Sequence, residues 1–210
     1  MLASKTGQLA RASMKRILDL AGAILGLAVF ALPMTIIAGL IRLRMGPPVL
    51  YRDMRPGLHG ELFVLYKFRT MSDLVDAAGR SLSDKERITS LGRILRKTSI
   101  DELPQLINVL RGDMSLVGPR PLMTEYLKLY TPQQARRHEV KPGITGLAQI
   151  NGRNRLRWEE RFALDVRYIN QASLVLDLRI LLQKILNVLK HDNISPDGDL
   201  DVPSFGGSLS

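Results

Sequence analysis

Two adjacent carboxylates, Asp101 and Glu102, are the residues best suited to chemistry on a phosphate group. Pro104 follows them closely, and proline is tolerated in a helix only within the first turn, so a helix over Leu103–Leu110 must begin near residues 99–102. The free N–H groups and positive dipole at a helix start keep an aspartate ionised and attract phosphate oxygens. An ionised aspartate could act as a nucleophile, although simple capping of the helix explains the same two residues.

Three arginines could bind phosphate oxygens beside this pair. Arg96 lies shortly before Asp101, Arg120 lies in a Gly-Pro-Arg-Pro stretch, and Arg153 lies in an Asn-Gly-Arg-Asn stretch. A planar guanidinium binds phosphate through two parallel N–H donors, which suits arginine to this task. Each of them alone is typical of a protein surface, but together with the carboxylates they favour a phosphate-binding site. The sequence contains no Walker or Rossmann glycine motif.

The composition narrows the ligands and metals that such a site could bind. The 210 residues include 30 Lys and Arg against 20 Asp and Glu, and the net charge of +10 favours anionic partners. There is no cysteine, which excludes disulfides, thiolate zinc sites and thiol nucleophiles. The three histidines, His59, His138 and His191, are far apart in the sequence, so any metal should be bound through oxygen.

A basic module without catalytic activity is an alternative that this charge allows. Such a module would bind anionic lipid or nucleic acid through its Lys and Arg side chains. Only 5% of the residues are aromatic, which leaves little surface for stacking bases. The module would also leave Asp101 and Glu102 beside three loop arginines unexplained, so we expect an enzyme and no nucleic-acid partner.

An apolar segment from Ile17 to Ile41 predicts insertion into a membrane. Asp19 is its only charge, and the segment is long enough to cross a hydrocarbon core of roughly 30 Å. It is longer than the core of a cleaved signal peptide, which makes that alternative less favoured. Basic residues flank both ends and Pro33 lies inside, which fits a hairpin that enters and leaves by one face. A spanning helix with a proline kink explains the same residues.

The rest of the chain predicts a globular domain over 47–194, after an N-terminal part over 1–46 and before a flexible tail over 195–210 that is rich in Gly, Ser, Pro and Asp. The expected elements are a strand over 61–68, with Lys67 and Arg69 near its end, helices over 84–96, 103–110, 158–169 and 172–190, and loops with one charged helical piece over 118–154. The last helix is either a core helix or an amphipathic helix at the membrane surface. The expected fold class is therefore α+β and mostly helical.

The order of the motifs resembles that of one protein family. The motifs are KRILD at 15–19, RPG at 55–57, YKFRTM at 66–71, SIDELPQ at 99–105, GDMSLVGPRP at 112–121 and RRHEVKPGITGLAQINGR at 136–153. Over residues 15–191 the chain resembles the monotopic phosphoglycosyl transferases, also called the bacterial sugar transferase family. The resemblance implies a re-entrant helix-break-helix hairpin in one membrane leaflet, joined to a small cytoplasmic domain with interfacial amphipathic helices. Family members often have Ser-Pro at the break, whereas this chain has Leu32 and Pro33, and Thr35 could replace the serine.

The resemblance also implies the reaction. Members of the family move a sugar-1-phosphate from a UDP-sugar to undecaprenyl phosphate and release UMP, as the first membrane step of glycan, exopolysaccharide or glycoconjugate assembly. By position, Asp101 is the expected nucleophile, and Asp101 and Glu102 are the expected ligands of Mg²⁺, unless Glu102 moves a proton instead. The side chains expected around the phosphates and the nucleotide are Lys67, Arg69, Arg96, Arg120 and Arg153.

The location implied by the resemblance is the bacterial inner membrane, with membrane lipids as partners and the catalytic domain facing the cytoplasm. An aspartyl phosphosugar would form first and undecaprenyl phosphate would then attack it, which predicts ping-pong kinetics. In the alternative mechanism the lipid phosphate attacks the UDP-sugar directly and Asp101 only binds the metal. The sequence leaves the transferred sugar, the glycan pathway and a homodimer open.

Overall fold

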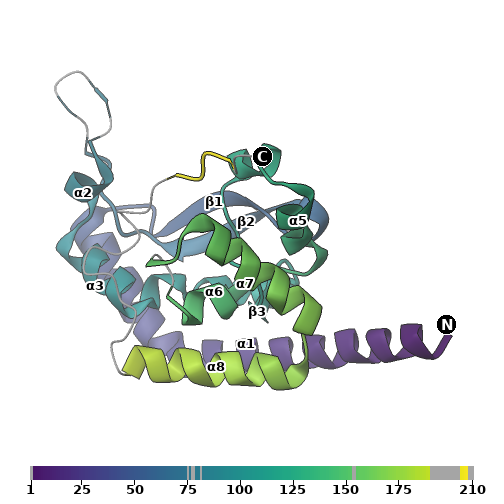
Figure 1. The fold of residues 1–210 in the computed structure, drawn as a ribbon. Helices are drawn as coiled ribbons and strands as arrows, with labels where there is room; N and C mark the ends of the chain where they lie inside the picture. Colours follow the sequence, from purple (N-terminus) through teal and green to yellow (C-terminus); the bar gives the residue numbers. More distant parts are fainter. Residues whose placement is uncertain are drawn as a thin grey trace.

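The structure is a computed structural model that describes residues 2–74, 76, 79–80, 82–152, 155–189 and 204–207, without the side chains of 2–10 and 189. Its first element is α1 (Leu2–Met45), a helix of 44 residues that contains the whole apolar segment and Pro33. Figure 1 shows that α1 is not straight: its first part runs along the base of the molecule beside α8, and its last part rises toward α3. The predicted helix-break-helix is therefore a bent but continuous helix.

The local contacts around Pro33 explain how the helix continues through it. Proline has no N–H to donate to the carbonyl of Val29, and its ring crowds that carbonyl. Two residues later, the Thr35 hydroxyl donates a hydrogen bond of 2.9 Å to the carbonyl oxygen of Ala31. Side-chain bonds of this kind to the preceding turn bend helices without ending them.

A hairpin follows α1 and carries Lys67. Its strands are β1 (Leu50–Pro56) and β2 (Leu62–Phe68), which pair in antiparallel register through the turn η1 (Leu58–Gly60). Strand β2 confirms the prediction over 61–68, whereas β1 was not predicted. The free edge of β2 is held by the fully buried Asn108, whose Oδ1 accepts from Tyr66 N and whose Nδ2 donates to Val64 O.

The next elements place the two carboxylates. The single helix predicted over 84–96 is divided into α2 (Asp84–Arg87) and α3 (Ser90–Thr98), because Ile88 between them forms a β-bridge with Met71. A 3-10 turn, η2 (Ile100–Glu102), then precedes α4 (Gln105–Arg111), which ends at Gly112 with φ of 93°. The predicted helix end is confirmed, whereas the carboxylates lie in the turn before α4 rather than in its first turn.

A pair of short parallel strands holds the loop that contains Arg120. Strands β3 (Ser115–Val117) and β4 (Gly143–Thr145) pair in parallel, and Gly118 directly follows β3. A Cβ atom on Gly118 would lie 2.4 Å from the carbonyl oxygen of Lys141, so only glycine fits at this position. The remaining elements are η3 (Thr124–Lys128), α5 (Pro132–Ala135), η4 (Arg136–Glu139), α6 (Leu147–Ile150), α7 (Trp158–Gln171) and α8 (Leu174–Leu189). Short turns dominate 118–152 and both later helices are present, as predicted.

Both parts of α1 pack against the same globular body. Ala23 lies in a core cluster with Leu65, Leu106, Val109 and Met114. Farther along the helix, Ile41 lies in a second cluster with Phe68 and Leu95. Between these two contacts, α1 exposes large apolar side chains, including those of Leu25, Val29, Leu32 and Ile36.

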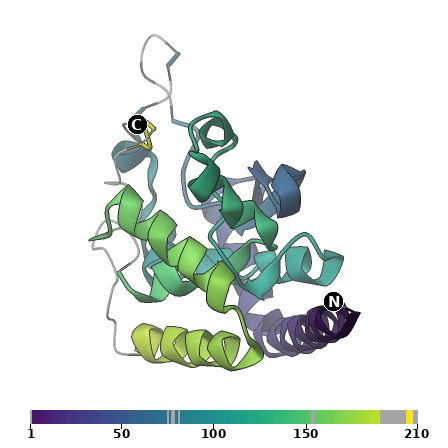
Figure 2. The ribbon, with the colours of Figure 1, turned by 45° about the vertical axis from the view of Figure 1, so that its right-hand side comes forward.

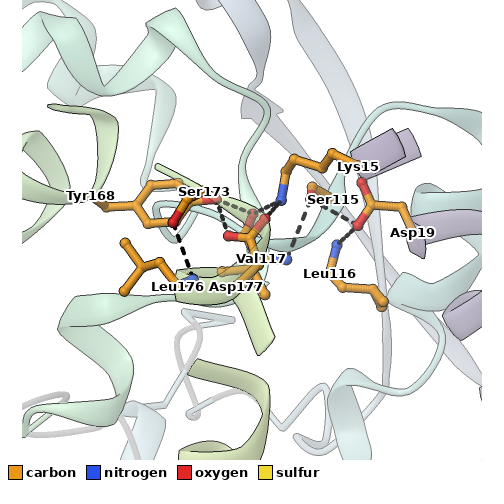
Figure 3. A network of polar contacts seen from close by, with 9 residues as sticks. All are labelled: Lys15, Asp19, Ser115, Leu116, Val117, Tyr168, Ser173, Leu176 and Asp177. Atoms are coloured by element: carbon orange, nitrogen blue, oxygen red, sulfur yellow. Dashed lines mark hydrogen bonds and ion pairs between the residues drawn. The ribbon is translucent and has the colours of Figure 1, made fainter. Parts of the chain in front are cut away.

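A polar network fixes the start of α1 to β3 and α8 (Figure 3). The buried carboxylate of Asp19 accepts hydrogen bonds of 2.9 Å from Ser115 Oγ and from Leu116 N. One turn earlier, Lys15 Nζ lies 2.7 Å from Asp177 Oδ2 on α8 and also donates to the carbonyl of Val117. The only charge in the apolar segment is thus a structural anchor within the protein.

Helix α8 presents an apolar stripe outward. Val175, Leu178, Leu182 and Ile185 are exposed, whereas Asp177 and Ile180 on the other side of the helix are buried. Figure 2 shows α8 and the first part of α1 along the same lower face of the molecule. The first part of α1 and α8 therefore lie along one side of the fold.

Candidate active site

The two carboxylates lie in a buried, positively charged environment. Asp101 and Glu102 are only 7% and 5% exposed. Glu102 Oε1 lies 3.2 Å from Lys67 Nζ at the end of β2 and 2.8 Å from the guanidinium of Arg120 in the loop after β3. Elements far apart in the sequence thus place two cations on one carboxylate oxygen.

Asp101 differs from its neighbour because, in the described part of the chain, no hydrogen-bond donor reaches its carboxylate. Burial, and secondly the negative charge of Glu102, raise the pKa of Asp101 to about 6, while Lys67, Arg120 and Arg96 oppose the increase. Cations near a carboxylate favour its ionised form. No described side chain therefore donates a hydrogen bond to the Asp101 carboxylate. The nearby cations favour the ionised form of this carboxylate.

Arg96 is the third cation near the carboxylates. It follows Gly92 on α3, where a Cβ atom would lie 1.9 Å from the carbonyl oxygen of Thr70, so this glycine lets the helix lie against the end of the hairpin. There Arg96 Nε donates to Thr70 Oγ1 at 3.0 Å. The structure thus brings Lys67, Arg96 and Arg120 near Asp101, and their predicted role in phosphate binding stays a prediction.

Arg69 does not join this group, which corrects the prediction that it binds the phosphates or the nucleotide. Its guanidinium is buried and donates to the carbonyl oxygens of Met45 and Pro47 and to the carboxylate of Asp73. The two carbonyl contacts hold the end of α1 and the residues just after it against the hairpin, so Arg69 has a structural role. Arg153 lies outside the described residues, and its predicted role stays a prediction.

Sequence reasoning missed Arg137, which supports the site by binding the backbone of Arg120. Its guanidinium is 4% exposed, lies 3.0 Å from Asp165 of α7 and donates to the carbonyl oxygen of Arg120 at 2.5 Å. In the sequence Arg137 belongs to a charged run, and such runs are usually solvated. No local signal distinguishes it from its exposed neighbours, because its partners come from other elements.

The carboxylates also fit a divalent cation. Among the residues that the structure describes, no cluster of three or more His, Asp or Glu side chains could hold a metal. Mg²⁺ does not require one, because it keeps several waters and uses one or two carboxylates together with substrate phosphates. Asp101 and Glu102 provide such a pair of carboxylates. After burial, the repulsion between their charges is the second cause of the raised pKa of Asp101, and a bound cation would relieve this repulsion.

Comparison with known proteins identifies the family of this chain. The family model described as "Bacterial sugar transferase" matches residues 10–191. The "Uncharacterized sugar transferase EpsL" of Bacillus subtilis (strain 168) is 52% identical over 195 residues, 93% of this chain and 96% of the relative. The "UDP-glucose:undecaprenyl-phosphate glucose-1-phosphate transferase" of Caulobacter vibrioides is 45% identical over 194 residues, 85% of this chain and 71% of the relative. The "Undecaprenyl-phosphate galactose phosphotransferase" of Salmonella typhimurium is 39% identical over 196 residues, 85% of this chain and 41% of that longer protein. The chain belongs to the bacterial sugar transferase family.

Proposed function

We propose that the protein transfers a sugar-1-phosphate from a UDP-sugar to undecaprenyl phosphate. In the first half-reaction an oxygen of Asp101 attacks the β-phosphorus, and the bond between that phosphorus and the bridging oxygen breaks as UMP leaves with the electron pair. In the second, a phosphate oxygen of the lipid attacks the same phosphorus and releases the Asp101 carboxylate. The products are UMP and a lipid diphosphosugar, and the enzyme returns to its initial state.

The single observation that carries this proposal is the contrast between the two carboxylates. Two cations hold Glu102, whereas the described residues leave the Asp101 oxygens without a hydrogen bond. Lys67, Arg96 and Arg120 can bind the phosphate oxygens on which negative charge develops. The relatives from Caulobacter vibrioides and Salmonella typhimurium, whose names specify undecaprenyl phosphate with glucose or galactose, support the acceptor and the reaction class.

The proposal includes Mg²⁺ held by Asp101 and Glu102 together with the diphosphate. When bound, the ion neutralises charge on the diphosphate and on the departing UMP. The protein's own contribution is positional. Glu102 keeps Lys67 and Arg120 directed at the site, and the burial of Asp101 limits the access of water to the attacking oxygen.

We further propose that α1 is a re-entrant membrane helix whose two ends face the cytoplasm of a bacterial inner membrane. Both ends are tied to one globular body: Arg16 donates to the carbonyls of Val109 and Leu110, and Arg69 donates to the carbonyl of Met45. Between these ends, large apolar side chains such as Leu25, Val29 and Leu32 are exposed and available to lipid, while the exposed Arg42 and Arg44 lie near the second end. The basic flanks before and after the apolar segment fit the positive-inside rule.

Single-cysteine labelling tests this topology cleanly, because the native chain contains no cysteine. Ser13→Cys and Ser90→Cys place an exposed thiol before and after the membrane segment. Both thiols should resist an impermeant maleimide in intact cells and react after the cells are opened. Labelling of only one of them in intact cells would show that α1 crosses the membrane, and labelling of both would place both ends outside the cytoplasm.

The outward stripe of α8 completes the proposed membrane face. Val175, Leu178, Leu182 and Ile185 would lie at the level of the lipid headgroups, beside the apolar side chains of α1 (Figure 2). Of the two alternatives for the last helix, this proposal adopts the amphipathic helix at the membrane surface. Leu182→Ser should weaken binding to anionic vesicles more than Gln183→Ser at the adjacent exposed position does.

The decisive experiment measures transfer of labelled sugar-phosphate from a panel of UDP-sugars to undecaprenyl phosphate with Mg²⁺, for the wild type and for Asp101→Asn. The wild type should form product with at least one donor, and without lipid acceptor it should gain the mass of one phosphosugar. The variant should do neither. Product without the protein adduct would favour direct attack by the lipid phosphate, and activity retained by Asp101→Asn would exclude Asp101 as the nucleophile.

A further inference from the structure

The C-terminal segment Ser204–Gly207 lies in contact with the catalytic domain, which differs from the flexible tail predicted there. Phe205 is only 4% exposed although it lies far beyond the end of α8 in the sequence. Its backbone N–H donates to the hydroxyl of Tyr126 at 3.1 Å. The segment thus has both a buried side chain and a directed backbone bond, and Figure 1 shows it in yellow beside the α5 side of the fold.

Four aromatic rings surround Phe205 and are called the aromatic cage: Tyr126, Tyr130, Trp158 and Phe162. The ring centroid of Phe205 lies 5.0 Å from that of Phe162 and 5.5 Å from that of Trp158, and the other two are 5.6 Å and 6.0 Å away. These distances fall within the range of favourable aromatic pairs. Without Phe205, the cage would present a concave apolar surface to water.

The aromatic cage is joined to the catalytic loop through Arg137. The guanidinium of Arg137 lies 5.5 Å from the ring of Phe162 and donates to the hydroxyl of Tyr130. The same guanidinium donates to the carbonyl oxygen of Arg120, whose own side chain contacts Glu102. A continuous set of contacts therefore leads from Phe205 to the catalytic carboxylates.

We propose that Ser204–Gly207 is a built-in docking peptide for the aromatic cage, and that the filled cage holds Arg120 in place through the positioning residue Arg137. The occupant is this chain's own C-terminal segment, seated there in the structure. The docking is independent of the reaction, whereas the effect on Arg120 rests on the proposed function. Enzyme activity should then depend on a segment that contains no catalytic residue.

Tryptophan fluorescence tests the docking directly, because Trp158 is the only tryptophan in the chain. In the full-length protein in detergent micelles, Phe205→Ala should shift the Trp158 emission to longer wavelength and increase its quenching by acrylamide. Ser204→Ala, at the exposed neighbouring position, should change neither. Wild-type emission and quenching in Phe205→Ala would overturn the docking.

A synthetic peptide of residues 201–210 tests the link to Arg120 and guards against simple misfolding. Added to the Phe205→Ala protein, it should restore the Trp158 emission, and the same peptide with Ala for Phe205 should bind at least about tenfold more weakly, equivalent to about 1.4 kcal/mol. The variant's kcat should be about tenfold or more below that of the wild type, since small displacements of phosphate-binding groups are costly.

The concentration dependence of the rescue distinguishes positioning from general stability. The peptide should restore kcat and emission with the same half-saturating concentration. If the peptide restores the Trp158 emission of Phe205→Ala but the kcat of this variant equals that of the wild type, the link between the cage and Arg120 is overturned and the docking stands. Absence of transfer by the wild type with every UDP-sugar would refute the proposed function, while the fluorescence would still decide the docking.

Discussion

The guanidinium of Arg120 lies 2.8 Å from a carboxylate oxygen of Glu102. Arg120 is held at its other end by Arg137, which binds its backbone carbonyl. The side chain that we assign to phosphate binding is therefore fixed at both its backbone and its tip. Groups fixed before the substrate arrives stabilise developing charge without the cost of reorganisation.

Replacing Arg120 with Ala should lower kcat/KM for sugar-phosphate transfer by about 10²–10³-fold, the range found when one fixed donor to developing charge is removed. The measurement is initial rates with the best UDP-sugar donor. Arg93→Ala removes an exposed arginine from α3 and should leave the rate unchanged. Equal rates for the two variants would contradict the assigned role of Arg120.

Replacing Asp19 with Leu should lower the free energy of unfolding by about 1–3 kcal/mol, because Ser115 Oγ and Leu116 N would lose the acceptor that they share. Asp19→Asn keeps an acceptor oxygen of similar geometry and should be much closer to the wild type. Thermal unfolding in detergent compares the three proteins. If Asp19→Leu were as stable as the wild type, the buried carboxylate would have no anchoring role.

Gly118→Ala should destabilise the protein by about 1–3 kcal/mol, the usual cost of forcing extra atoms into a packed site. The new methyl group would meet the carbonyl oxygen of Lys141 at 2.4 Å and would displace the loop before Arg120. Activity should therefore decrease with stability. Gly39→Ala on α1, where nothing lies within 4 Å, is the matched control and should have wild-type stability and activity.

The stability of the protein should decrease in mild acid through His138. Its Nδ1 lies 3.0 Å from the carbonyl oxygen of Gly57, which can only accept, so Nδ1 carries the proton in the neutral ring, and the buried Nε2 has no partner among the described residues. Burial, helped by the charge of Arg137, lowers the pKa of His138 below its ordinary 6.5, although the bond to Gly57 opposes this. The unfolded chain therefore takes up the proton first as pH falls.

The contribution of His138 to the free energy of unfolding should thus be complete above about pH 6.5 and decrease as pH falls from there toward the lower folded-state pKa. Denaturant unfolding at a series of pH values measures it. His138→Asn keeps a side-chain N–H for Gly57 but does not titrate, so its stability should depend less on pH in this range. Replacing the exposed His59 with Asn should leave the dependence unchanged, and an identical dependence in both variants would rule out His138 as its source.

Local sequence rules predicted the elements whose determinants lie close together in the chain. Aromatic and β-branched residues between turn signals predicted the strand that is β2, and Gly112 ended α4 because a left-handed residue is needed there. Pro104 restricted the start of that helix, which placed Asp101 and Glu102 just before it. The strand β1 was missed because its residues Leu50–Pro56 are mixed in polarity; three of the seven are partly buried, three are exposed and Pro56 is buried.

The sequence by itself therefore determined the apolar segment, the principal helices and the pair of carboxylates, because periodicity, proline and glycine act over a few residues. Only the tertiary structure distinguished the cations near Asp101 from the arginines that have structural roles. Arg69 binds the carbonyls at the end of α1, while Arg137, from an unremarkable charged run, supports Arg120. A buried guanidinium must have partners, and here these partners come from distant parts of the chain. Long-range packing likewise brought Phe205 into the aromatic cage, which composition alone could not predict.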